Sequence, residues 1–178
     1  RTCKGRRILL CLISMLVLTV FTYNGSASVS YLFERERFGW VLQQHNVYDS
    51  ANIILSISGC IIGLTILKKF FNFSDMALIF LSISSGILDA SLKAFASAGW
   101  QMYVISAIAL FRILASPMTR TMITTIVPHT EIGKVFAATT AFEALSALAS
   151  SPLYTVVYSK TMIFFPGAFF LITACVYS

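Results

Sequence analysis

Residues 111–142 read FRILASPMTRTMITTIVPHTEIGKVFAATTAF and join two apolar runs, each near the length needed to cross a membrane. Arg112 lies inside the first run, and a Ser-Pro pair at 116–117 interrupts that run near its end. A polar connection follows before the second run, which contains Glu143. The stretch therefore predicts two membrane-spanning helices with an ionisable side chain inside each.

Apolar runs of this kind make up nearly the whole chain. Of the 178 residues, 57% are hydrophobic and 11% are charged, with a mean hydropathy of +0.82, whereas an ordinary soluble domain has about 25% charged residues. Helices satisfy their own backbone groups in lipid, and the period-two alternation of a membrane barrel is absent. The basic residues behind the net charge of +6 are scattered between the runs and not gathered on one face. We predict an all-α transmembrane protein with a lipid bilayer as its surroundings and no nucleic acid as a partner.

We expect a single transmembrane domain over 1–178. The run boundaries predict six helices at about 8–30, 49–67, 76–98, 100–118, 135–157 and 162–178. Residues 31–48 are polar and aromatic, so we expect them to form an outer loop in which the ERER of 34–37 is solvated. Tyr154 and Tyr158 are expected to anchor the fifth helix at the membrane interface. Because the chain starts at Arg1 and its last apolar run reaches 178, we expect a segment of a longer protein.

The orientation follows from the distribution of lysine and arginine between the two sides of the predicted bundle. Eight basic residues fall on one side: Arg1, Lys4, Arg6, Arg7, Lys68, Lys69, Arg120 and Lys134. Four fall on the other side: Arg35, Arg37, Lys93 and Lys160. Since cytoplasmic loops are enriched in basic residues, the first side is predicted to be cytoplasmic. Six spans then place both ends of the chain in the cytoplasm.

Four ionisable residues fall inside the predicted spans, where each costs about 2.5–3.5 kcal/mol unless it is paired or hydrated. Asp89 and Lys93 are four residues apart on one helix and can form a self-neutralising pair near the outer interface. Arg112 and Glu143 come out at matching depth on consecutive antiparallel helices, so we expect them to be partners. Two interpretations stay open, namely a structural salt bridge and a cavity site for an anionic substrate or a proton.

Two further residues of the quoted stretch are candidates for a role in gating. Arg120 either closes the inner end of such a cavity or extends its charged end to lipid phosphates. Pro117 is expected to break one backbone hydrogen bond and bend its helix, as in transporter helices that gate and also in helices that never move.

Catalytic and metal-binding patterns are missing from the sequence. Cys3, Cys11, Cys60 and Cys175 have no metal-ligand spacing, so we expect free thiols and predict no cofactor or metal. There is no HExxH, GxSxG or Walker sequence. We therefore predict that the chain is not an enzyme.

The order of these features resembles the second half of a major facilitator superfamily carrier: a basic lead (KGRR), six helices, and inner loops after the second and fourth. More narrowly, the chain resembles the solute carrier family that includes the proton-coupled folate transporter. The likeness extends over the whole chain and is specific from about residue 110 onward. It is carried by Pro117-x-x-Arg120, Glu131-x-Gly133, Tyr158 and Pro166-Gly167.

This resemblance implies a six-helix half built as a 3+3 inverted repeat, whose first, second, fourth and fifth helices line a central cavity while the third and sixth face lipid. It implies proton-linked uptake of an organic anion such as a folate, a muropeptide or a cyclic dinucleotide. Arg120 matches the position of a functionally important arginine. The implied partner is an N-terminal half of the same carrier, in the plasma membrane or an endolysosomal membrane. The alternative is a small multi-pass membrane protein that packs with or stabilises a partner and transports nothing.

The predicted orientation can be checked by cysteine labelling in intact cells. A cysteine introduced at Arg35 should react with a reagent that cannot cross the membrane, because its loop is predicted outside. A cysteine introduced at Thr130 should react only after permeabilisation. Labelling of Thr130→Cys in intact cells, above the level of the parent chain, would reverse the orientation.

Overall fold

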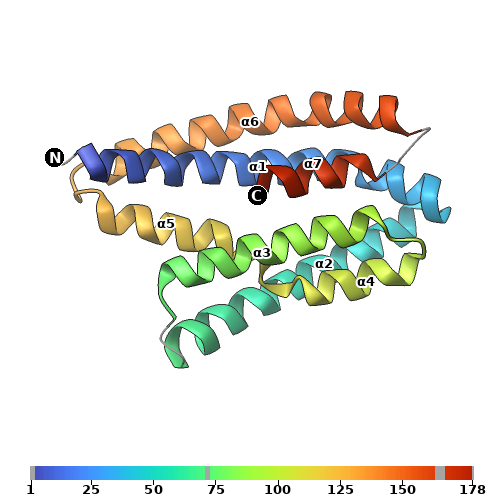
Figure 1. Ribbon diagram of the computed structural model, residues 1–178, viewed down its shortest axis with the longest axis horizontal. Coiled ribbons are helices and arrows are strands. Elements are labelled where there is room, and N and C mark those ends of the chain that lie inside the picture. Colours follow the sequence, from blue (N-terminus) through green and yellow to red (C-terminus); the bar gives the residue numbers. More distant parts are fainter. Residues whose placement is uncertain (1–2, 71–72, 163–166, 178) are drawn as a thin grey trace.

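The computed structural model describes residues 3–70, 73–162 and 167–177, and the regular elements of these ranges are all helices. Figure 1 shows long helices lying side by side along one axis, with the chain reversing direction from one long helix to the next. The elements are α1 (Cys3–Phe38), α2 (Leu42–Ile62), the π-helical η1 (Gly63–Phe70), α3 (Asp75–Ala94), α4 (Gly99–Ile108), the 3₁₀ turn η2 (Leu110–Leu114), α5 (Ala115–Ile126), α6 (Ile132–Thr161) and α7 (Ala168–Tyr177).

Length and apolar character qualify four of these segments as membrane spans: Arg7–Phe38, Leu42–Leu67, Asp75–Ala94 and Ile132–Thr161. The pair Gly99–Ile108 and Leu110–Ile126 is bent by 53° and counts as a fifth span if it crosses as one unit. The described part of the last predicted helix, α7, is a shorter apolar helix of 10 residues. Large apolar side chains on the outer faces, such as Ile54, Phe80 and Leu148, are exposed as lipid contact requires. The predicted all-α, multi-pass membrane class is confirmed.

The expected outer loop over 31–48 is wrong, because helix occupies most of it. α1 continues to Phe38 and ends where Gly39 adopts a positive φ of 67°, a conformation that glycine tolerates best. The side chain of Gln44 accepts a hydrogen bond from the Val41 N–H at 3.2 Å and so caps the start of α2. Only three residues, 39–41, separate the two helices. Since α1 keeps its helical register, Glu34 turns inward and is fully buried, while the other three residues of ERER stay exposed.

The break in the fourth predicted helix lies before the Ser-Pro pair and not at it. α4 ends at Ile108 and the chain continues as the 3₁₀ turn η2 before α5 begins. Pro117 is the third residue of α5, where a missing N–H leaves no helical hydrogen bond unmade. In an unbroken α-helix its ring would collide with the carbonyl of Ile113, which is consistent with the tighter turn that precedes it.

The core lies where α1 meets α6 and α7. Val29 and Phe33 of α1 pack there with Phe169 and Phe170 of α7, and with two tyrosines of α6. Those tyrosines, at 154 and 158, are buried, so the expectation that they anchor α6 at the membrane interface is wrong. Their rings fill the space between three helices, and the Tyr154 hydroxyl is hydrogen-bonded to Thr173 at 3.0 Å.

Glycine allows α2 to approach the 3₁₀ turn closely. A Cβ atom added at Gly59 would collide with the backbone carbonyl of Leu110, and one added at Gly63 would meet the side chain of Leu114 at 2.5 Å. The bent segment η2 therefore rests against the end of α2 and the start of η1, which have no side chain at these two positions.

We predict that Gly59→Ala lowers the thermal stability of the purified protein in detergent. The added methyl group would meet the backbone carbonyl of Leu110, which cannot rotate away as a side chain can. Overpacking of this kind costs about 1–3 kcal/mol. Gly133→Ala is the matched control, because a Cβ there meets nothing within 4 Å. Equal melting temperatures for the two variants would contradict the close approach of α2 and η2.

Candidate functional site

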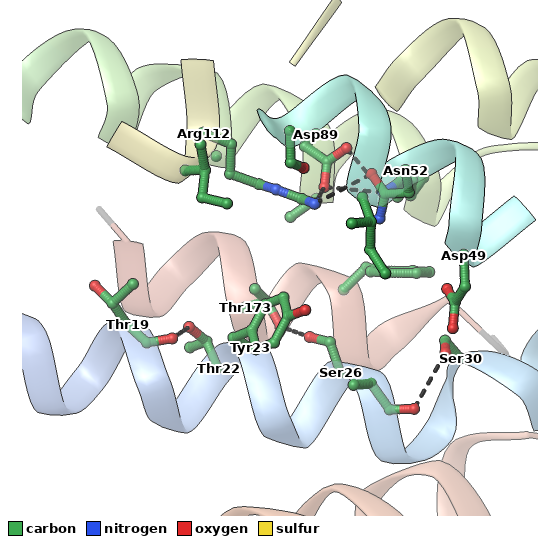
Figure 2. Close-up of a pocket in the computed structure, with 18 of the residues that line it drawn as sticks. Thr19, Thr22, Tyr23, Ser26, Ser30, Asp49, Asn52, Asp89, Arg112 and Thr173 are labelled. Carbon is green, nitrogen blue, oxygen red and sulfur yellow. Dashed lines mark hydrogen bonds and ion pairs between the residues drawn. The ribbon is translucent and has the colours of Figure 1, made fainter. Parts of the chain in front are cut away.

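A cavity of about 570 Å³ lies among the helices, and α1, α2, α3 and α7 supply most of its lining. Figure 2 shows two unlike walls. Arg112, Asp89 and Asn52 form one wall, and hydroxyl groups of α1 with Thr173 of α7 form the other.

The charged wall is built around the carboxylate of Asp89. Lys93 Nζ lies 2.9 Å from its Oδ1 and donates a hydrogen bond to its Oδ2 at 3.1 Å. Arg112 Nη1 pairs with the same Oδ2, and Arg112 Nη2 donates to Asn52 Oδ1 at 3.4 Å. The side chains of Asp89 and Lys93 are only 6% and 5% exposed, whereas that of Arg112 is 22% exposed. One carboxylate thus neutralises one of two cations, and the more accessible cation is Arg112.

The helix break positions Arg112, and a serine of α3 holds the break. Ser82 Oγ donates to the Arg112 carbonyl at 2.7 Å and accepts from the Ala115 N–H at 2.8 Å. Backbone groups on both sides of the turn are thereby bonded inside the bundle, where an unpaired group would be costly. The 3₁₀ turn can therefore exist at membrane depth and direct Arg112 into the cavity.

The second wall is a stripe of hydroxyl groups along α1. Thr19, Thr22, Ser26 and Ser30 recur every three or four residues, so they share one face of the helix. Ser26 is also hydrogen-bonded to Thr173 of α7 at 3.1 Å. This stripe is not among the residues predicted from the sequence, although its helical spacing is a signal that could have revealed it.

The predicted partnership of Arg112 with Glu143 is wrong. Arg112 pairs with Asp89, while the single nitrogen Nη2 of Arg120 contacts both carboxylate oxygens of Glu143 at 2.8 Å. The Arg120 and Glu143 side chains are 36% and 11% exposed and do not line the cavity. Equal depth along two helices did not decide the pairing, because the side chains point to different sides of their helices. The predicted Asp89–Lys93 pair is confirmed, with Arg112 as a third member.

The expected set of lining helices also needs correction. α6, the fifth predicted helix, contributes no described residue to the lining, whereas α3 and α7, the third and sixth, do. The reason is visible in Figure 1, where α1 and α7 lie between α6 and the helices α2 to α5.

A second ionisable cluster lies at the end of the cavity near the α1–α2 junction. Glu34 Oε2 is 2.6 Å from His45 Nδ1, and His45 Nε2 is 3.4 Å from Asp49 Oδ2. Glu34 and Asp49 line the cavity. This cluster is not among the residues predicted from the sequence, because Glu34 and His45 fall in the predicted outer loop.

The described cysteines are free thiols, as expected from the sequence. Cys11, Cys60 and Cys175 form no disulfide in the described part of the chain. The side chain of Cys3 and the Pro166 of the predicted Pro-Gly step lie outside the described residues.

These features define a multi-pass α-helical membrane protein with a charged cavity between its helices, the architecture in which membrane carriers hold their solutes. The chain is 36% identical over 174 residues to the probable peptidoglycan muropeptide transporter SLC46 of Drosophila melanogaster, a match that covers 96% of this chain and 34% of that protein. The chain is thus related to the SLC46 solute carriers, which confirms the resemblance drawn from its motifs.

Vertebrate proteins of the same family match as well. The chain is 27% identical over 171 residues to the lysosomal proton-coupled steroid conjugate and bile acid symporter SLC46A3 of Gallus gallus, covering 96% of this chain and 36% of that protein. The human SLC46A3 is 28% identical over 170 residues, which is 95% of this chain and 36% of that protein. The chain spans about a third of the length of these curated relatives. No family model matches it.

We predict that Asp89→Asn strongly destabilises the protein. Removing the carboxylate leaves Lys93 and Arg112 as buried cations without a counter-charge, a loss of about 3–5 kcal/mol. The variant should melt at a lower temperature in detergent, and adding Lys93→Met should recover part of the loss by removing one excess cation. If Asp89→Asn melts like the wild type, the carboxylate does not hold the two cations together.

Proposed function

We propose that the chain is the six-helix half of a major facilitator superfamily carrier, and that its cavity binds an organic anion which moves together with protons. The observation that carries the proposal is the charge balance of the wall around Asp89. Two cations that line the cavity share one carboxylate there, and Arg112 is the more exposed of the two. An anion entering the cavity would balance the remaining positive charge.

The guanidinium is well suited to this role. Arg112 uses Nη1 for Asp89 and Nη2 for Asn52, so its planar fork is already fixed in orientation. A guanidinium has five N–H donors, and those left over can bind a carboxylate or sulfate. The hydroxyl wall opposite offers donors and acceptors for the uncharged remainder of a polar solute.

The relatives support the choice of solute class. Their names specify a muropeptide for the Drosophila protein and steroid conjugates and bile acids for the vertebrate proteins, and each of these groups includes organic anions. The vertebrate names also specify proton coupling and a lysosomal location. We propose the same solute class and coupling here, in an endolysosomal or plasma membrane.

Arg120, Glu143 and Pro117 enter the proposal as coupling and gating elements away from the solute. The Arg120–Glu143 ion pair joins α5 to α6, and Pro117 lies in the first turn of α5. If α5 moves relative to α6 as the carrier opens, this pair has to separate and form again.

The remaining parts of the carrier are also proposals. An N-terminal half would supply the other wall of a full transport path, in line with the relatives' greater length. The relatives are transporters, which supports a carrier over both a non-transporting packing partner and an enzyme.

The test is uptake of a radiolabelled steroid sulfate by the full-length protein in cells. Arg112→Lys should raise the apparent Michaelis constant by about tenfold or more, because an ammonium group cannot bind Asp89, Asn52 and an anion with one planar fork. Arg120→Lys should change it little, since a single nitrogen contacts both oxygens of Glu143 and an ammonium can replace it.

Arg35→Lys, on the exposed end of α1, is the control for surface expression and for arginine replacement in general. An unchanged Michaelis constant in Arg112→Lys at normal surface level would remove Arg112 from the solute site.

A further inference from the structure

The cluster at the α1–α2 junction differs from an ordinary surface ion pair. Glu34 is fully buried, and its Oε1 has no hydrogen-bond partner among the described residues. Its other oxygen, Oε2, is 2.6 Å from His45 Nδ1, a direct contact that leaves no room for an ion between them. A carboxylate without solvent is stable only beside a positive charge or with its own proton. The pair therefore needs one proton more than a neutral imidazole carries, held either by the imidazole as imidazolium or by the carboxyl group.

Three further side chains lie around this pair, and two of them carry charges that respond to whether the pair has bound a proton. Asp49 on α2 lies 3.4 Å from the other ring nitrogen of His45 and adds a second negative charge. The ring of Tyr31 on α1 packs against the imidazole with centroids 5.2 Å apart. Lys93 on α3 is close enough to act on the charge of Glu34 while it binds Asp89.

We propose that the Glu34–His45 pair is the proton-binding site that couples transport to the proton gradient, a step that rests on the proposed function above. With the proton bound, the contact between α1 and α2 is satisfied. Without it, the buried carboxylate of Glu34 and the half-exposed carboxylate of Asp49 flank a neutral imidazole, and the junction is destabilised. Few other contacts join α1 to α2, and only residues 39–41 link them, so this pair has a large share in holding the two helices together.

Its place in the cavity gives the proton a way to act on the solute. Glu34 and Asp49 line the same cavity as Arg112, and Lys93 interacts with acidic groups at both ends. Binding a proton at Glu34–His45 removes one negative charge from the cavity and so strengthens its attraction for an anion. By reciprocity, a bound anion holds the proton more tightly, which is the thermodynamic condition for moving the two together.

The location fits the direction of the gradient. The cluster lies at the end of α1 opposite the basic N-terminal residues, so the positive-inside rule assigns it to the outer or lumenal side. On that side an acidic compartment would supply protons to this end of the cavity.

The experiment uses the full-length protein in liposomes with a radiolabelled steroid sulfate, and it measures two quantities. The first is accumulation driven by an acidic exterior, and the second is exchange of labelled for unlabelled solute without a gradient. One proton moving with one monovalent anion supports about tenfold accumulation per pH unit. Glu34→Gln, which keeps the shape of the protonated acid, should retain exchange within about twofold of the wild type and lose this accumulation. His45→Gln should likewise retain exchange and lose gradient-driven accumulation.

Two matched controls should keep both activities: Glu36→Gln, an exposed carboxylate two residues further on, and His129→Gln, an exposed histidine. Gradient-driven accumulation by both Glu34→Gln and His45→Gln at the wild-type level would overturn the proposal. If Glu34→Gln folds poorly and loses exchange, His45→Gln decides, because it leaves the buried carboxylate in place. Absence of exchange in the wild-type protein would instead refute the proposed transport function itself.

Discussion

The carboxylate of Asp89 is the constraint on which the interior of this bundle depends. It lies between Lys93 of its own helix and Arg112 of the 3₁₀ turn, and Arg112 reaches on to Asn52 of α2. In a low-dielectric interior none of these charges could stay ionised alone, so three segments of the chain must meet at this point. The cavity exists beside that meeting point because ionised side chains resist replacement by lipid or by apolar packing.

The break between α4 and α5 follows from the same constraint. A continuous helix through 110–114 would present Arg112 differently, and the turn that presents it exposes backbone groups that need partners. Ser82 bonds two of them, and the glycine face of α2 lets the turn approach closely. Helix breaks at membrane depth in transporters are tolerated where neighbouring helices satisfy the freed groups, and here α3 does so.

Two separate sets of charges correspond to two parts of the proposed function. The Asp89 wall and the Glu34–His45 pair share one cavity, with Lys93 between them, which suits a solute and a proton that influence each other. The Arg120–Glu143 pair lies outside that cavity and joins α5 to α6. An ion pair between two neighbouring helices is a contact that a change in their relative position would break, so it suits a role in opening and closing.

The sequence alone was sufficient for the all-α membrane class, for the i,i+4 pair of Asp89 and Lys93, and for the family resemblance, because these depend on composition, helical spacing and local motifs. It did not decide which charges meet across helices. Arg112 pairs with Asp89 and not with Glu143. Such a pairing depends on the rotation and tilt of each helix, and these are determined by the packing of many side chains. The prediction of a loop over 31–48 also hides the inward turn of Glu34, although Ser26, Ser30 and Glu34 recur every four residues. Only the tertiary structure decided it, because the end of α1 is set by the positive φ of Gly39 and the burial of Glu34 by the packing of α2 against that end.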